Sequence, residues 1–200
     1  MENLTFVKMS DCPKNVQKEV AAVFVEGYYN DLSQLNKNKE VLVEALEGSF
    51  NPDVFYLAYS NDKIIGINAC SNNKGRALNL DKQKFRKHFG LIKGSIIYSI
   101  MIKEFHYHLD YPDNKAYIEC VATLPETRGK GVATKLMQFI IDSETYTEYE
   151  LEVTDTNTSA RKIYEKMGFV TFKTVPEKKS KSRGFNERIY MKYNKNKPVS

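Results

Sequence analysis

The sequence has few of the features that mark secreted, membrane-spanning or disulfide-rich proteins. Its three cysteines, Cys12, Cys70 and Cys120, form no Cys-x-x-Cys pair. An odd number without that spacing argues against a disulfide framework and a cysteine-rich zinc site, so we expect reduced thiols. No apolar run approaches the ~18 residues that cross a bilayer, and the N-terminus lacks the basic start and apolar run of a secretory signal. We therefore expect a cytoplasmic protein without a membrane partner.

The chain also lacks internal repeats and low-complexity segments. Hydrophobic residues make up 42% and charged residues 28% of its 200 residues, which is typical of an ordered globular protein. We predict one domain over 1–193 and a frayed tail over 194–200.

The net charge of +5 favours anionic partners but does not separate nucleic acid from a phosphorylated cofactor. His106 and His108, two residues apart, do not indicate a metal site, and we expect none.

Hydrophobic periodicity predicts a mixed α/β fold. Turn residues between the second and third predicted strands indicate a β-hairpin. The predicted strands are 4–9, 54–59, 64–70, 117–123, 148–154, 169–175 and 187–193. The predicted helices are one that begins near Pro13, one that ends at Gly48, and those at 81–89, 94–107, 131–143 and 160–167.

The segment Arg128-Gly129-Lys130-Gly131-Val132-Ala133 follows a predicted strand and opens an amphipathic helix. A helix N-terminus offers unpaired N–H donors and partial positive charge, and glycines there let a pyrophosphate approach the backbone. The spacing is neither GxxxxGK[ST] nor GxGxxG, so it does not predict a P-loop or a dinucleotide fold. An ordinary glycine-rich turn is the other interpretation of this segment alone.

A second segment, residues 157–169, also follows a strand and reads N-x-x-A-x-x-x-Y-x-x-x-G-F. Together with the form R-x-x-G-x-A at 128–133, it resembles the two signatures of the GNAT superfamily, the general N-acetyltransferases that use acetyl-CoA. The resemblance strictly covers about 116–193. It implies a mixed α/β (α+β) fold with a central, largely antiparallel sheet, splayed at the cofactor cleft and covered by helices on both faces. Residues 71–115 would be a helical insertion without a counterpart in the minimal pattern.

The resemblance also implies a set of cofactor-binding residues. The glycine-rich loop would hold the pyrophosphate of acetyl-CoA, and the strand before it would lend backbone hydrogen bonds to pantetheine and the thioester oxygen. Asn157 would contact the cofactor, act as a helix N-cap, or do both. The implied cofactor contacts are Val121, Ala122, Thr123, Arg128, Gly129, Lys130, Gly131, Val132, Ala133 and Asn157.

Tyr164 falls where the family places the acid that protonates the departing CoA thiolate. The alternative is an aromatic side chain that fills the core. An alkylamine acceptor is mostly protonated at neutral pH, so a base or a chain of waters has to remove a proton. Glu119 is our candidate base, because alternation places it on the strand face of Thr123; a strand carboxylate held in an ion pair is the other interpretation. Glu152 is the second choice.

These residues predict direct acyl transfer from acetyl-CoA to an amine. A covalent acyl-enzyme through Cys120 is the less favoured route, because a cysteine in mid-strand is usually a small buried hydrophobe. The alternative function is a CoA-binding regulatory or interaction protein without turnover. A nucleic-acid-binding module is supported by net charge alone, and we do not expect it. Small amines, antibiotics, amino acids and protein amines all stay open as acceptors, as do monomer and homodimer.

Residues 71–115 are the segment in which we place acceptor specificity, since functional residues concentrate in such variable elements. We predict that four apolar residues anchor the longer helix of this segment on the sheet. They are Ile96, Ile97, Ile100 and Met101. The predicted acceptor contacts are Tyr98, His106 and Tyr107, and a purely structural cap is the alternative.

Overall fold

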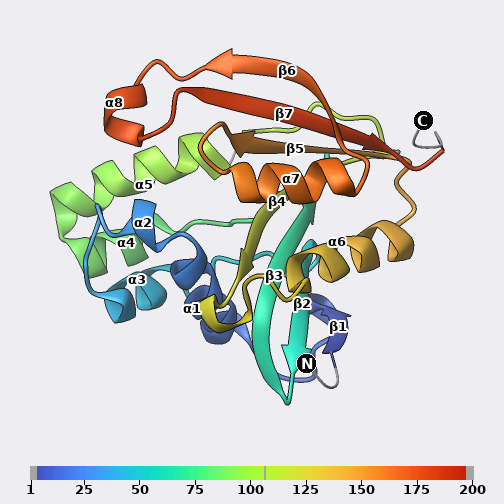
Figure 1. Ribbon diagram of the computed structural model, residues 1–200. Helices are drawn as coiled ribbons and strands as arrows, with labels where there is room; N and C mark the ends of the chain where they lie inside the picture. The colour runs from blue at the N-terminus through green and yellow to red at the C-terminus, as the bar shows by residue number, and fades with distance from the viewer. Residues whose placement is uncertain (1–3, 106, 197–200) are drawn as a thin grey trace.

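The computed structural model describes residues 4–105 and 107–196, and within them one sheet has seven strands in the order β1-β2-β3-β4-β5-β7-β6. All neighbouring strands are antiparallel except β4 and β5, which are parallel. Figure 1 shows β5, β6 and β7 lying across the direction of β2 and β3. The strands are β1 (Leu4–Lys8), β2 (Phe55–Ser60), β3 (Lys63–Ser71), β4 (Lys115–Thr123), β5 (Glu148–Thr154), β6 (Val170–Pro176) and β7 (Glu187–Asn194).

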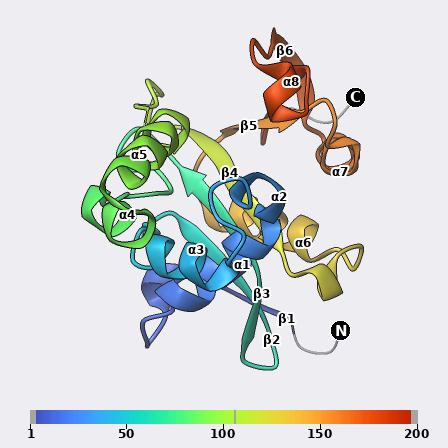
Figure 2. The same cartoon turned by 90° about the vertical axis from the view of Figure 1, so that its left-hand side faces the viewer.

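Helices cover both faces of this sheet. Figure 2 shows α1 to α5 on one side of the strands and α6 and α7 on the other. The α-helices are α1 (Gln17–Gly27), α2 (Tyr29–Leu32), α3 (Lys39–Leu46), α4 (Lys82–Phe89), α5 (Leu91–Phe105), α6 (Val132–Ser143), α7 (Thr158–Lys166) and α8 (Ser180–Arg183). Two short 3-10 helices are η1 (Met9–Asp11) and η2 (Pro125–Thr127). The predicted fold class is confirmed. The sequence did not predict α2 and α8, because each is too short to give a periodic signal.

The local sequence explains how the strands connect. Asn61 and Asp62 have positive φ angles of 49° and 61°, which short polar side chains tolerate, and they join β2 to β3 as a hairpin. At the other end of the sheet, β7 continues to Asn194, and Lys195 donates from Nζ to the carbonyl of Ile141 at 2.7 Å. The described chain is therefore held to the sheet close to its last described residue.

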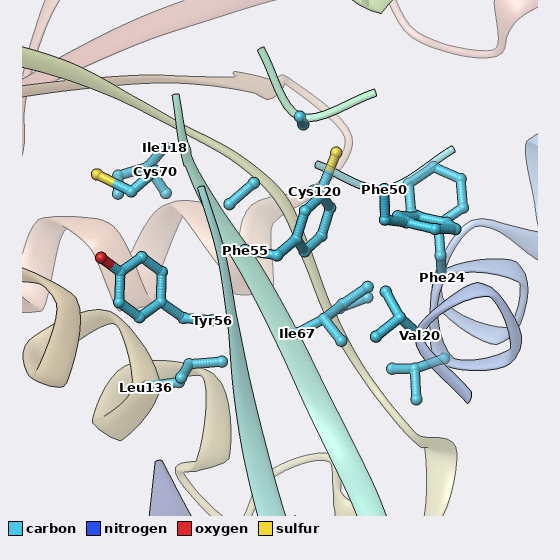
Figure 3. Close-up of a cluster of buried hydrophobic side chains, with 14 of the residues drawn as sticks. Val20, Phe24, Phe50, Phe55, Tyr56, Ile67, Cys70, Ile118, Cys120 and Leu136 are labelled. Atoms are coloured by element: carbon cyan, nitrogen blue, oxygen red, sulfur yellow. The ribbon is translucent and has the colours of Figure 1, made fainter. Parts of the chain in front are cut away.

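The core lies on both sides of the central strands. Figure 3 shows Phe24, Phe50 and Phe55 on the α1 side, and Tyr56 and Leu136 on the α6 side. The rings of Phe50 and Phe55 meet edge to face at 5.3 Å between centroids. Each fully buried side chain of this size stabilises the fold by about 1.5–3 kcal/mol through the hydrophobic effect. This two-sided packing fixes the position of β4, which carries the candidate site.

The expectation that four apolar residues anchor α5 was wrong for two of them. Ile97 and Met101 are buried, but Ile96 is 56% and Ile100 is 49% exposed. The buried positions follow the spacing i, i+3, i+7 from Gly94, so Ile96 and Ile100 fall on the outer side of the helix. Among the described residues, no helix combines the length and apolar character needed to span a bilayer.

Candidate active site

The ladder between β4 and β5 ends half-way along β4. Four residue pairs join the two strands, from Lys115 and Glu148 to Ile118 and Leu151. Beyond Ile118, no further pair to β5 is formed by the part of β4 that the structure describes, which extends to Thr123. Backbone groups on that edge of β4 are thus available to other partners. The splayed pair of strands implied by the family resemblance is present.

A β-bulge lies where the two strands part. Ala69 of β3 is opposite Glu119, but Ile67 is opposite Ala122, so β4 uses three residues where β3 uses two. Cys120 takes a φ of 55° within the bulge. A left-handed conformation at a residue other than glycine typically costs about 1–3 kcal/mol and is concentrated at functional sites. The bulge therefore marks this part of β4 as a special backbone position.

The bulge changes which side chains share a face of β4. Alternation predicted Glu119 on the face of Thr123, and that prediction was wrong. Glu119 bonds to Ser71 on the α1 side of the sheet, whereas Thr123 lies beside Gly66 on the α6 side. The extra residue in the bulge shifts the alternation by one, which moves every later side chain to the other face. Figure 3 shows the Cys120 side chain on the α1 side, with Phe55.

Glu119 is held in a buried ion pair. Arg76 donates from Nε and Nη2 to its two carboxylate oxygens at 2.9 and 2.8 Å, and the two side chains are 7% and 8% exposed. Ser71 Oγ and the backbone N–H of Ala77 also donate to Glu119. A carboxylate with this many donors is engaged on both oxygens. Between the two interpretations left open by the sequence, the geometry favours the ion-paired carboxylate.

Arg76 also fixes part of the 71–115 segment next to β4. Its Nη1 donates to the carbonyl of Tyr107 at 2.6 Å, and its guanidinium lies over the Tyr107 ring, 4.1 Å from the centroid. Tyr107, a predicted acceptor contact, is thereby close to Glu119. Tyr98 lies elsewhere, against Phe85 at 6.1 Å between ring centroids. His106 lies outside the described residues.

The glycine-rich loop forms an open helix start. Gly129 and Gly131 have φ angles of 74° and 76°, and a Cβ built on either would meet no atom within 4 Å. Gly131 is the N-cap of α6 and supplies no side-chain cap to the first N–H groups. Arg128 and Lys130 are exposed beside it, and Arg128 Nη2 donates to the carbonyl of Glu26 at 3.4 Å. The loop thus combines open space, unpaired donors and positive charge.

The remaining predicted cofactor contacts fall around this loop. Val132 is buried and its side chain faces Gly66 of β3, while Ala133 is half-buried in the first turn of α6. Val121 is half-buried on β4. Ala122 is buried and directed towards α1.

Asn157 caps the other helix of the motif. Its side-chain oxygen accepts from the N–H of Ala160 at 3.2 Å, at the start of α7. The N-cap role proposed from the sequence is therefore present, and the exposed position of Asn157 leaves the second proposed role, contact with a cofactor, compatible with the structure.

Tyr164 is buried on α7 with its ring 6.1 Å from that of Phe169. Burial raises the pKa of its phenol to about 12. Within the described chain the Tyr164 hydroxyl has no hydrogen-bond partner, so it is a neutral donor that a ligand can use. The ring packs in the core, as expected for an aromatic side chain that fills it. The hydroxyl is free to act as the acid that the family resemblance implies.

Tyr28 is a site residue that the sequence patterns missed. Its hydroxyl donates to the carbonyl of Val121 at 3.4 Å. Burial raises the pKa of Tyr28 well above its usual range, and the neighbouring Cys120, Tyr164 and Glu119 raise it further. Tyr28 therefore connects the end of α1 to the bulge and to Tyr164.

Gly27 explains why the end of α1 comes so near β4. A Cβ built on Gly27 would overlap the side chain of Ala122. Only glycine permits so close an approach of helix and strand. This glycine, one residue before Tyr28, is the single sequence signal that could have indicated the contact.

Cys120 fits the structural interpretation better than the nucleophilic one. The side chain is 4% exposed. Burial, and after it the charge of Glu119, raises the pKa of the thiol well above its usual range. The thiol, rather than the reactive thiolate, is then the form present at neutral pH.

Glu152, the second candidate base, is also paired. It bonds to Arg188 of β7, and Arg188 bonds in turn to Glu104 of α5 at 3.0 Å. Arg183 of α8 reaches Glu104 at 3.3 Å. These ion pairs tie the β6–β7 connection to the C-terminal end of α5. In the described residues no group of three potential metal ligands is present.

Asn68 is a second feature that no sequence pattern indicated. It lies on β3 two residues after Gly66, on the α6 side, and is fully buried. Neither its amide nitrogen nor its amide oxygen has a partner in the described chain. A buried amide without a partner is costly. The Asn68 amide NH2 group and amide oxygen are thus left for a bound molecule or a water beside the bulge.

We expect the free energy of unfolding to fall as the pH rises above 10. The phenol of Tyr164 ionises at about 12 in the folded chain against 10.0 for its ordinary value. The unfolded chain therefore binds fewer protons between pH 10 and 12, and stability that is fully present below pH 10 is lost as the pH rises through 12. Tyr164 alone contributes a slope of about −1.4 kcal/mol per pH unit.

Urea unfolding at several values between pH 9 and 11.5 measures this slope. Tyr164→Phe should make it shallower. An unchanged slope would mean that the phenol is not buried in the folded state.

The amino-acid sequence matches the model of the acetyltransferase (GNAT) family over residues 24–169. No curated protein matches it. Among solved structures, the fold is similar to an N-acetyltransferase from Staphylococcus aureus Mu50, with a TM-score of 0.61 and 17% identity over 94% of this chain and 100% of that chain. It is also similar to the ribosomal-protein-S18-alanine N-acetyltransferase from Escherichia coli, with a TM-score of 0.59 and 11% identity over 98% and 96% of the two chains. PH1933 from Pyrococcus horikoshii OT3 gives a TM-score of 0.58 and 19% identity over 98% and 100%.

At these identities the structures support the fold, and the family model, which covers more than half of the sequence, supports the family. The structure has parted strands β4 and β5, as the resemblance implies, with Gly131 at the start of α6 and Tyr164 on α7. The chain belongs to the acetyltransferase (GNAT) family.

Proposed function

We propose that this chain transfers an acetyl group from acetyl-CoA to an amine by direct attack of the amine on the thioester. One observation carries the proposal. The open helix start at Gly131 and the end of β4 that has no β5 partner are joined by a short loop. The Tyr28 hydroxyl bonds to that strand end, and Tyr164 is a neighbour of Tyr28. A phosphate site, free backbone groups and neutral donors are thus assembled together.

The residues present fit acetyl-CoA. The space above Gly129 and Gly131 is open, and the exposed Arg128 and Lys130 supply charge for a pyrophosphate. Backbone groups of Val121 and Thr123 lie on the stretch of β4 without a β5 partner, where pantetheine amides find donors and acceptors. The bound thioester would supply an activated acetyl group and a thiolate leaving group.

Tyr164 is the residue we propose to donate a proton to the departing sulfur. Its raised pKa keeps the hydroxyl protonated at neutral pH, so it is a donor throughout the working range. Full proton transfer from a phenol to a thiolate is unfavourable, because the phenol has the higher pKa. A hydrogen bond without full transfer still stabilises the negative charge on sulfur. Tyr28 offers a second neutral hydroxyl next to Val121, the residue after Cys120.

Water is the proton acceptor that we propose for the amine. Both carboxylate oxygens of Glu119 are engaged by Arg76, and Glu152 is engaged by Arg188. A carboxylate in this state is a weak candidate for a general base.

Glu119→Gln should therefore leave the pH dependence of kcat/KM unchanged. Loss of the acidic limb of that pH profile would instead assign the general base to Glu119.

These paired carboxylates also favour a second candidate function, a CoA-binding regulatory protein without turnover. Both functions require acetyl-CoA to bind and to raise the melting temperature. They differ in the release of free thiol from acetyl-CoA in the presence of a panel of small amines, amino acids and peptides. Release above the hydrolysis blank supports the enzyme; binding without release supports the regulatory protein.

Tyr164→Phe is expected to lower kcat by about 10- to 100-fold while acetyl-CoA affinity stays within twofold. The change removes the hydroxyl and keeps the packing ring. Tyr193→Phe is the matched control, because Tyr193 packs on the same Phe169 ring, 5.4 Å away. Equal kcat for wild type and Tyr164→Phe, with chemistry rate-limiting, would return Tyr164 to a packing role.

A further inference from the structure

The first turn of α5 carries the most exposed large hydrophobic side chains of the described chain. Leu91 is 75% and Ile92 is 80% exposed. Ile96 and Ile100 continue the row along the outer side of α5. Leaving aliphatic side chains of this size in water is unfavourable, and contiguous apolar surface of this kind marks interaction sites. We call these four residues the aliphatic row.

Basic residues surround the aliphatic row. Residues 81–105 contain six Lys or Arg and two Asp or Glu, and so carry +4 of the formal +5 of the whole chain. Lys87 and Lys93 are exposed and form no ion pair with any described carboxylate. Arg86 is exposed and donates from Nε to Ser95 Oγ at 2.8 Å. Positive charge is thus concentrated at one edge of the molecule.

A shallow hollow lies beside Leu91, the first residue of the aliphatic row. It has a volume of about 330 Å³ and is lined by Gln83, Arg86, Lys87 and Leu91. Two cations, an amide and an aliphatic side chain around one hollow suit an anionic headgroup next to an acyl chain. Figure 1 shows α4 and α5 together at the left edge of the molecule, and Figure 2 views the molecule from that side.

The shape and composition of this surface indicate which partner it fits. A second copy of the chain would bring the Lys87 and Lys93 charges of both copies together, which is unfavourable. Protein interfaces are enriched in aromatic residues and depleted in lysine, whereas this surface has aliphatic side chains and mostly lysine. Aliphatic side chains flanked by Lys and Arg are the pattern of segments that lie in a lipid headgroup region.

We propose that the end of α4 and the start of α5 bind anionic lipid bilayers, with Leu91 and Ile92 inserted among the headgroups and Arg86, Lys87 and Lys93 against the lipid phosphates. Binding is peripheral and reversible, and it departs from the sequence-based expectation of no membrane partner. The proposal is independent of the acetyl-transfer chemistry, since this surface contains none of the residues assigned to that chemistry.

Vesicle co-sedimentation of the full chain tests this proposal. Vesicles of phosphatidylcholine with 30% phosphatidylglycerol should retain the protein in low salt, and pure phosphatidylcholine should retain at least about tenfold less. Raising the salt to about 0.5 M should release most of the bound protein. Leu91→Ser with Ile92→Ser should weaken binding by about tenfold or more. Arg86→Gln, Lys87→Gln and Lys93→Gln together should weaken it by about 100-fold.

Val170→Ser is the matched control, because Val170 is 58% exposed on β6, away from this surface. Its binding should equal that of wild type, and the melting temperatures of all variants should agree. Absence of binding to anionic vesicles would overturn the proposal. So would equal binding by wild type and the Leu91, Ile92 variant. A dimer that dissociates on the same substitutions, without vesicle binding, would assign the surface to self-association instead.

Discussion

Gly131→Val is expected to weaken acetyl-CoA binding by about 100-fold or more, equivalent to about 3 kcal/mol. The reason is geometric. The N–H groups at the start of α6 have no side-chain cap, and the space above Gly131 is open. A valine side chain would fill this space and keep a pyrophosphate away from the donors. Isothermal titration calorimetry with acetyl-CoA measures the loss directly, without depending on turnover.

The left-handed φ of Gly131 adds strain of about 1–2 kcal/mol to any such substitution. Gly184→Val controls for that strain, because Gly184 has a φ of 75°, against 76° for Gly131, and is equally open. Both variants should lose similar stability, and only Gly131→Val should lose affinity. Normal acetyl-CoA binding by a folded Gly131→Val variant would show that the loop is not the phosphate site.

Arg76→Met is expected to destabilise the fold by about 3–5 kcal/mol, because it leaves the Glu119 carboxylate buried without its partner. Four donors converge on Glu119, and two of them belong to Arg76. Urea unfolding at neutral pH measures the change. A loss below about 1 kcal/mol would mean that water reaches the carboxylate in the folded chain.

Two further variants separate the ion pair from general effects of substitution. Arg76→Met combined with Glu119→Gln should lose less stability than the sum of the single changes, since no lone charge stays buried. Arg161→Met is the matched exposed case. Arg161 pairs with Glu165 at 2.8 Å, and both side chains are more than 40% exposed, so this change should cost less than about 1 kcal/mol.

Most of the sheet and the long helices could be predicted because their signals are local. The alternation at 148–154 matches β5, and the apolar spacing from Ala160 to Met167 marks α7 within two residues. Gly168, with a φ of 92°, follows the end of that helix. The two motifs located Gly131 and Tyr164 for the same reason, because each is read from consecutive residues.

The missed features all depend on contacts between distant segments. No periodicity in 117–123 shows that Cys120 adopts a left-handed conformation, so the face of Glu119 was assigned wrongly. Tyr28 joins the site only because α1 packs on β4 through Gly27. The apolar composition of α5 predicted burial, but which side of a helix faces the sheet is decided by its neighbours.

Because the Arg76–Glu119 pair crosses from one segment to another, residues 72–114 are not an exchangeable module. Polar bonds tie the start of the segment to other parts of the chain. Asn72 donates to the Tyr146 hydroxyl, between α6 and β5, at 2.8 Å, and the Ala77 N–H donates to Glu119 of β4 at 3.3 Å. A chimaera in which this segment is replaced by one without an arginine at position 76 would keep the buried Glu119 carboxylate without its partner. Grafting experiments within this family would therefore need to move position 119 together with position 76.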